Sequence, residues 1–175
     1  MDVDETGALP VSLMPVDEQR LAELVAVATS AAAANEVTPP LTPGHDWTPT
    51  RVRWLEEYHR QRRGGLDGPA GEATWAVVAE GQVVGSVRLK ALPGPGQLET
   101  GIWLARHVRG KGLGRQAIAA VLQHASAAGA LEVLAETTSG NKAAQGLLSS
   151  LGFRLEAPDD VRVLGRIEIG EPAAP

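Results

Sequence analysis

The residues with the clearest chemical potential form a glycine-rich, basic turn at positions 109–115, with the sequence RGKGLGR. Its glycines let the backbone approach a ligand closely and turn N–H groups inward. The helix expected after the turn adds unpaired N–H donors and a partial positive charge, and three basic side chains add full charges. The turn therefore predicts a site for the diphosphate of a ligand.

Two common phosphate-binding patterns do not fit this turn. No Gly-Lys-Ser/Thr closes it, and Arg115 and Gln116 stand about where the dinucleotide fingerprint needs its third glycine. Nucleoside triphosphates and NAD are therefore disfavoured as ligands. A glycine-rich turn standing alone is often only a turn, so the interpretation needs a second motif.

That second motif is the segment 141–153, NKAAQGLLSSLGF. Together with Arg109, Gly112 and Gly114, which read as Arg-x-x-Gly-x-Gly, it resembles the acyl-coenzyme A N-acyltransferases of the GCN5-related (GNAT) superfamily. The resemblance covers roughly residues 74–169. It implies the GNAT fold, acetyl-CoA as the acyl donor and direct transfer to an amine.

The resemblance also implies a coenzyme A site. Main-chain groups of the strand GIWL are implied to run beside the pantetheine arm and to stabilise the oxyanion, where one donor is typically worth about 3 kcal/mol. Asn141 is equally suited to cap its helix, and both roles use the same helix start. The implied residues are Ile102, Trp103, Leu104, Arg109, Gly110, Lys111, Gly112, Leu113, Gly114, Arg115, Asn141, Ala144 and Leu148.

Glu99 is the candidate general base. An amine is largely protonated at neutral pH, so a base is useful, and in related enzymes a strand carboxylate near this position deprotonates the acceptor. Strand alternation places Glu99 on one face with Gly101 and Trp103. The alternative is a solvent-exposed strand glutamate, or one paired with Arg88 or Lys90 on the neighbouring strand.

The proton donor to the leaving thiolate departs from the pattern of many relatives. Leu148 stands where they have tyrosine, which places the chain nearer the ribosomal-protein N-terminal and aminoglycoside-type branch of the family. That branch commonly has serine where Ala144 stands, and alanine cannot donate a proton. We expect Ser149 or a bound water to serve instead.

The acceptor-binding residues are expected in the region before the sheet. The resemblance nominates His45, Asp46, Trp47, Trp54 and Tyr58, together with Glu99, as substrate-binding residues. Acids and aromatics suit a cationic amine. Trp54 and Tyr58 also have the spacing of buried helix positions. The four histidines show no metal-ligand spacing, so no metal is proposed.

The helices and strands that must position these residues are predicted from the spacing of apolar residues and from the glycines and prolines that interrupt regular structure. Helices are predicted over 17–34, 48–63 (with Thr48 as N-cap and Pro49 first), 112–128 and 142–151. Extended segments are predicted over 74–80, 82–92 and 96–105 as an antiparallel meander, and over 131–137 and 161–169. The order predicts an α+β fold: a central mixed, mostly antiparallel sheet flanked by helices.

Length and composition narrow the remaining choices. The 175 residues predict one domain (1–175), with variable N-terminal helices and an acceptor loop (1–73), a sheet and coenzyme A core (74–169) and a coil tail (170–175). No cysteine is present, which excludes thiol catalysis. A net charge of −5 argues against nucleic acid as a partner. An N-terminus with acids and prolines, and no long apolar run, predicts a cytoplasmic protein without a membrane span.

The sequence thus predicts an acetyl-CoA-dependent N-acetyltransferase that acts on a primary amine of a small molecule through a ternary complex. The next candidates for the acceptor are a protein N-terminus and an antibiotic amine. A non-catalytic acetyl-CoA-binding sensor is the alternative of a different class, and a homodimer is the assembly that we carry as a hypothesis.

Overall fold

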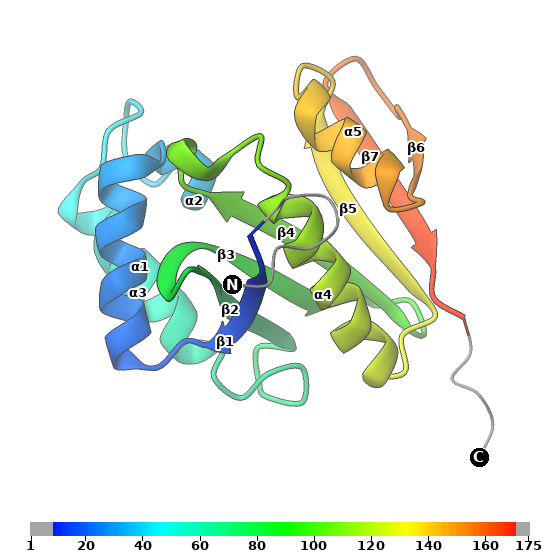
Figure 1. The fold of residues 1–175 in the computed structure, drawn as a ribbon, viewed down its shortest axis with the longest axis horizontal. Helices are drawn as coiled ribbons and strands as arrows, with labels where there is room; N and C mark the ends of the chain where they lie inside the picture. The colour runs from blue at the N-terminus through cyan, green and yellow to red at the C-terminus, as the bar shows by residue number, and fades with distance from the viewer. Residues whose placement is uncertain (1–8, 171–175) are drawn as a thin grey trace.

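The computed structural model describes residues 9–170, which form one seven-stranded sheet with helices on both faces (Figure 1). The strand order is β1-β2-β3-β4-β5-β7-β6, and every neighbouring pair is antiparallel except β4 and β5. The predicted α+β class and mixed, mostly antiparallel sheet are confirmed. The strands are β1 Val11–Pro15, β2 Glu72–Ala79, β3 Gln82–Ala91, β4 Gln97–Leu104, β5 Glu132–Thr138, β6 Arg154–Glu156 and β7 Arg162–Glu168.

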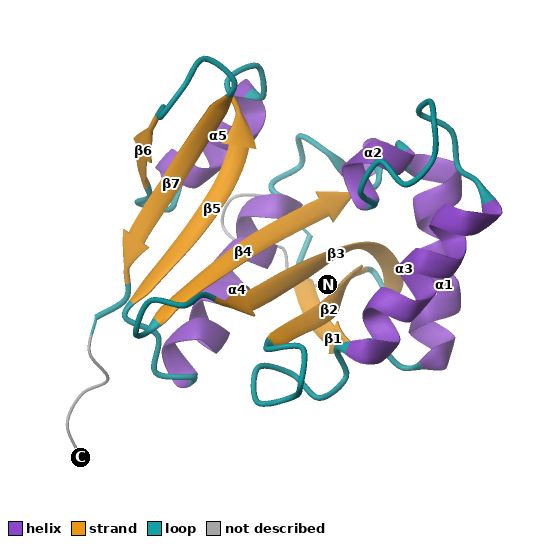
Figure 2. Cartoon of the chain, turned by 180° about the vertical axis from the view of Figure 1, so that it is seen from behind, coloured by secondary structure: helices purple, strands orange, loops and turns teal. Residues whose placement is uncertain are grey.

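The helices divide between the two faces of the sheet (Figure 2). Leu21 and Leu24 of α1 pack with Ala76 on one face, whereas Ala117 and Val121 of α4 join the core on the other face. The helices are α1 Glu18–Ala31, α2 Ala34–Val37, α3 Pro49–Gln61, α4 Leu113–Ala127 and α5 Lys142–Ser150, with a short 3₁₀ turn at Arg106–Val108. Within residues 9–170, no helix is long and apolar enough for a membrane crossing.

Helix starts follow the sequence signals closely. Thr48 caps α3 by accepting from the backbone N–H of Arg51, with Pro49 in the first turn, as predicted. Asp17 caps α1 and Asn141 caps α5 in the same way. The interpretation of 17–34 as a single helix was wrong. Helix α1 ends at Ala31, because the backbone of Ala32 is extended, and the short α2 begins at Ala34.

Two short strands were missed. β1 lies in the proline-containing N-terminal stretch, where Val11 and Leu13 pack against the core as the strand pairs with β2. β6 has only three residues and pairs with β7. Neither carries enough alternation to be read as a strand by itself. Of the predicted coil tail, only Gly170 lies inside the described residues.

The parallel pair β4–β5 separates half-way along β4. Pairing with β5 ends at Thr100 opposite Ala135, whereas β4 continues paired to β3 as far as Leu104. β5 meanwhile stays paired to β7 as far as Thr138. The last four residues of β4 therefore have no strand partner on the β5 side, and the sheet opens at its centre (Figure 2).

Candidate active site

The glycine-rich turn has the backbone geometry that its sequence predicts. Gly110 and Gly112 adopt left-handed φ values of 74° and 80°, which residues with a Cβ rarely adopt. Gly112 is the N-cap of α4 and supplies no side-chain cap, in contrast to the caps of α1, α3 and α5. The first-turn N–H groups of α4 are therefore left for an anion at the positive end of the helix.

A groove of about 770 Å³ runs from this turn into the opening between β4 and β5. The end of β4, the start of α4 and one side of α5 line it. Gly114 lets these elements approach, because a Cβ there would lie 2.9 Å from Leu147 of α5. The implied coenzyme A residues that line the groove are Ile102, Trp103, Leu104, Arg109, Gly110, Gly112, Gly114, Arg115, Asn141, Ala144 and Leu148.

Arg109 links the turn to the short helix α2. Its guanidinium donates to both carboxylate oxygens of Glu36, at 3.1 and 3.0 Å, and to the backbone carbonyl of Leu104. The hydrogen bonds from Arg109 hold the pKa of Glu36 below its usual value. Arg109 thus fixes the end of β4 and is paired with Glu36, so the anion donors left to the groove from the turn are its backbone N–H groups and the side chain of Arg115.

A second cleft, of about 390 Å³, lies on the α3 side of the sheet. It shares four lining residues with the groove, so the two spaces meet at the end of β4. These shared residues are Glu36, Gly101, Ile102 and Trp103. The other residues that line this cleft come from α2, α3 and strands β2 and β3: Val37, Trp54, Leu55, Tyr58, His59, Arg62, Glu72, Ser86, Val87, Arg88 and Lys90.

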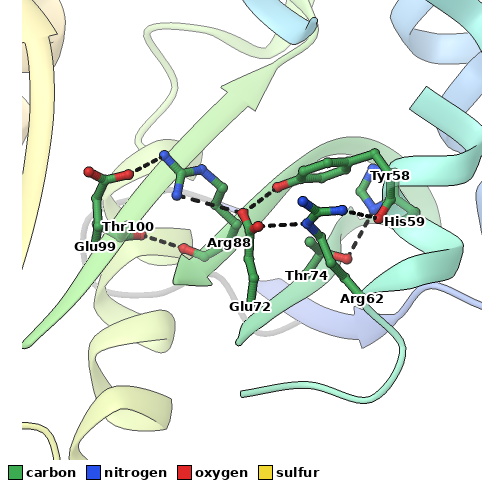
Figure 3. A network of polar contacts seen from close by, with 8 residues as sticks. All are labelled: Tyr58, His59, Arg62, Glu72, Thr74, Arg88, Glu99 and Thr100. Atoms are coloured by element: carbon green, nitrogen blue, oxygen red, sulfur yellow. Dashed lines mark hydrogen bonds and ion pairs between the residues drawn. The ribbon is translucent and has the colours of Figure 1, made fainter. Parts of the chain in front are cut away.

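A polar network centred on Glu72 forms one wall of the cleft (Figure 3). Glu72 is only 3% exposed, and it accepts hydrogen bonds of 2.6 Å from the Tyr58 hydroxyl and from Arg62 Nε. Burial raises the pKa of Glu72, but these hydrogen bonds and the positive charges of Arg62 and Arg88 together outweigh burial, and the net shift is downward. Burial and the hydrogen bond to Glu72 raise the pKa of Tyr58, so the phenol stays protonated at neutral pH.

Arg88 extends the network across β3 to β4. Its Nη2 donates to Glu99 Oε1 at 2.6 Å, while Nη1 lies 3.7 Å from Glu72 Oε1. Arg62 lies over the ring of Tyr58, 3.8 Å from its centroid, and Trp54 stacks on that ring. The aromatic pair is thus held by α3 and its charged neighbours.

Two clefts that meet on one strand, with uncapped helix N–H groups in the larger, can hold a long phosphorylated donor and an acceptor together. The sequence matches the acetyltransferase (GNAT) domain family over residues 11–154. The chain belongs to the GNAT acetyltransferases. It is an acetyl-CoA-dependent acetyltransferase with an acceptor substrate, and the residues of the larger groove fit coenzyme A.

Solved structures support the GNAT fold. Mycobacterium smegmatis RimJ, solved with a CoA disulfide, aligns with a TM-score of 0.73 and 20% identity over 90% of this chain and 81% of its own. RimL, a ribosomal L7/L12 α-N-protein acetyltransferase solved with coenzyme A, aligns with a TM-score of 0.69 and 16% identity over 96% and 97%. MccE, a microcin C7 self-immunity acetyltransferase solved with acetyl-CoA and AMP, aligns with a TM-score of 0.68 and 15% identity over 91% and 92%. A search of the curated proteins gave no match.

Two implied coenzyme A residues of this GNAT domain lie apart from the groove. Leu113 is 2% exposed and packs in the core, and Lys111 is exposed but does not line the groove. Ser149 is also exposed and is not a groove residue, whereas its neighbour Ser150 is. The hydroxyl of Ser150 donates to the Leu147 carbonyl.

The expected acceptor residues divide into two groups. Trp54 and Tyr58 line the smaller cleft, but His45, Asp46 and Trp47 do not. The His45 ring is 2.6 Å from the Asn35 amide, and Trp47 donates to the Ala32 carbonyl, so this loop folds back onto the α1–α2 connection. Glu99 shares the cleft face with Gly101 and Trp103, as alternation predicts, but it is paired with Arg88 and does not line the cleft.

Several cleft residues were missed by the sequence analysis: Glu36, His59, Arg62, Glu72, Arg88 and Lys90. A partial signal exists, since Trp54, Tyr58 and Arg62 recur every four positions on one face of α3. Of the strand residues, Arg88 and Lys90 were identified only as possible partners of Glu99, and the pair of Arg88 with Glu99 is present. Glu72 gives no signal, because its pairing with Lys90 across β2–β3 depends on register. Within residues 9–170, no three potential metal ligands gather at one site.

His59 makes the stability of the domain depend on pH. Burial, together with the charge of Arg62 and Arg63, lowers the pKa of His59 to about 4 from 6.5, against the opposing effect of Glu72. Because the unfolded chain binds this proton more readily, the free energy of unfolding falls as pH drops from 6.5 toward 4, by up to about 3 kcal/mol.

We expect a His59→Gln variant to show a much weaker pH dependence in this window, measured by urea denaturation at several pH values. His107→Gln, at an exposed histidine, serves as the control and should retain the slope. An equal slope in the wild type and in His59→Gln would contradict the assignment.

Proposed function

We propose that this GNAT domain transfers the acetyl group of acetyl-CoA directly to the primary amine of a small molecule, within a ternary complex. The observation that carries the proposal is the meeting of the groove and the cleft at Gly101, Ile102 and Trp103. A donor in the groove and an acceptor in the cleft would be held on the same stretch of β4, and this positioning is itself a large part of catalysis.

In the proposed reaction, the amine nitrogen bonds to the thioester carbonyl carbon and the C–S bond breaks. The turn 110–114 and the start of α4 would bind the diphosphate, and Asn141 and the free edge of β4 would bind the pantetheine arm. A backbone N–H of residues 102–104 would stabilise the oxyanion. Acetyl-CoA supplies the activated acetyl group.

Glu99 is the proposed general base and takes the amine proton through an intervening water. It lies on the cleft face of β4, and Arg88 fixes the position of its carboxylate at the cleft margin. The leaving thiolate takes its proton from Ser149 or from water. Leu148 has no proton to give, and the exposure of Ser149 favours water.

The test is thiol release from acetyl-CoA against a panel of amines, with Glu99→Gln beside the wild type. We expect at least one amine to stimulate release, and the variant to lose about 100-fold in kcat/KM. Glu132→Gln is the matched control, since Glu132 is also a strand glutamate, paired with Arg166 at 3.5 Å, and lines neither cleft.

Three outcomes would count against parts of the proposal. Unchanged kcat/KM in Glu99→Gln from about pH 6 to 9 removes Glu99 as the base. Release that occurs only with peptides bearing a free N-terminus assigns the domain to protein acceptors, the chemistry named for RimL. Coenzyme A binding without stimulation by any amine or peptide favours the sensor function.

A further inference from the structure

Arg88 lines the smaller cleft beside the point where this cleft meets the groove. Its Cα partner across β4 is Gly101, which lines both spaces. A Cβ on Gly101 would lie 2.9 Å from Arg88 Nε and 3.3 Å from its Cζ. The glycine thus allows the guanidinium to lie against the backbone of β4 at the site of the proposed transfer.

One end of this guanidinium has no hydrogen-bond acceptor. Nη2 is bound by Glu99, but Nη1 is buried and donates to none of the described residues. The nearest acid, Glu72, is 3.7 Å away at Oε1, and its two oxygens already accept from Tyr58 and Arg62. A buried charged N–H without an acceptor is unfavourable and calls for a partner.

The remaining charges of the cleft are consistent with an anionic partner. Both lining carboxylates are taken, Glu36 by Arg109 and Glu72 by Arg62. Lys90 lies two residues after Arg88 on β3 and also lines the cleft. It is exposed and forms no ion pair within residues 9–170. The cleft therefore has the unpaired ammonium of Lys90 and, at Arg88 Nη1, a guanidinium N–H without a hydrogen bond, but no unpaired carboxylate for a second cationic group of the acceptor.

We propose that the acceptor is an amine that also carries a carboxylate, as an amino acid does, and that the guanidinium of Arg88, which lines the cleft, and the ammonium of Lys90 bind this carboxylate. The inference rests on the proposed function and narrows its substrate class. One N–H and one ammonium suit the single charge of a carboxylate. Arg88 is a specificity-determining residue in this scheme, and it also positions Glu99.

The experiment uses matched acceptors: phenylalanine, leucine and glutamate, each as the free acid and as its C-terminal amide. The full chain is assayed with acetyl-CoA, and kcat/KM is compared within each pair. We expect the acids to be preferred by about 10- to 100-fold, with the difference mainly in KM, as for the loss of a charge-assisted hydrogen bond. Phosphoethanolamine and ethanolamine form a second comparison, for phosphate.

The variants are compared by the ratio of kcat/KM for the acid to kcat/KM for its amide. Damage to folding or to Glu99 lowers both values in a pair and therefore leaves this ratio unchanged. We expect Arg88→Gln to bring the ratio near unity, and Lys90→Met, at an exposed position, to lower it in part. A wild-type ratio near unity, or an unchanged ratio in both variants, overturns the proposal. A larger preference for phosphoethanolamine overturns the carboxylate assignment.

Binding is measured as well, by calorimetry of the same pairs with the protein saturated with coenzyme A. We expect each acid to bind about 10-fold or more tightly than its amide. This separates two failures. If no amine is acetylated, the proposed function fails, while the binding ratio still decides the carboxylate site. If amines are acetylated and bound without regard to the carboxylate, only the present inference fails.

Discussion

Replacing Gly112 with aspartate is expected to weaken coenzyme A binding by about 100-fold, on the order of 3 kcal/mol, while the domain stays folded. Gly112 has a left-handed φ of 80° at the start of α4. A Cβ there strains the turn. The carboxylate would also repel phosphate and compete for the same helix N–H groups. Isothermal calorimetry with coenzyme A measures the change.

Gly129→Asp is the matched control for this experiment. Gly129 follows α4 at its other end, with a φ of 78° and no atom within 4 Å of a built Cβ. It therefore carries a similar backbone strain and the same added charge, but far from the phosphate turn. Affinity that is unchanged in Gly112→Asp, or lowered equally in both variants, would refute the diphosphate assignment.

The second large effect is expected at Arg51. This side chain is fully buried, and no carboxylate is paired with it in the described part of the chain. Its guanidinium donates instead to side chains or carbonyls of α2 and of the segment that joins α2 to α3. The acceptors are Asn35, Thr38, Thr42 (both Oγ1 and the carbonyl) and Gly44.

Arg51→Met removes all of these donors at once and leaves several acceptors without partners. We expect the free energy of unfolding to fall by about 3–5 kcal/mol. Arg51→Lys should recover little, because one ammonium cannot reproduce the planar fork. Arg53→Met, at an exposed arginine of the same helix, should change stability by less than about 0.5 kcal/mol. A loss below about 1 kcal/mol for Arg51→Met in urea denaturation would contradict the anchoring role.

The contacts of Arg51 also bear on the loop that was expected to bind the acceptor, which does not line the cleft. The run of prolines and glycine around Thr42 correctly indicated a loop, and Thr48 correctly indicated the next helix. Nothing in the spacing showed that a buried guanidinium would bind Thr42 and Gly44. The His45 ring lies 2.6 Å from the Asn35 amide of α2, and neither His45 nor Asp46 lines the cleft.

The geometry of the glycine turn and of the elements beside it was predictable because it is set locally. A left-handed glycine, a helix start and a strand end are each set by a few adjacent residues, as at Gly112. The acceptor side is assembled from α3, β2, β3 and β4, and its central contact joins Tyr58 to Glu72. Such contacts depend on register and helix docking, so single-sequence patterns identify the residues only in part.

The opening between β4 and β5 also bears on how the protein avoids aggregation. An unpaired strand edge is a template on which a foreign strand can add. Here the inner unpaired edge, the last four residues of β4, lies within a groove walled by α5 and the glycine turn. The two outer edges are β1, which has five residues and ends in Pro15, and β6, which has three residues including Arg154 and Glu156. The inner free edge of the sheet is thus accessible only within a groove that suits a narrow, extended ligand. The two outer edge strands are short and end in proline or carry charge, which disfavours the addition of a strand from another protein.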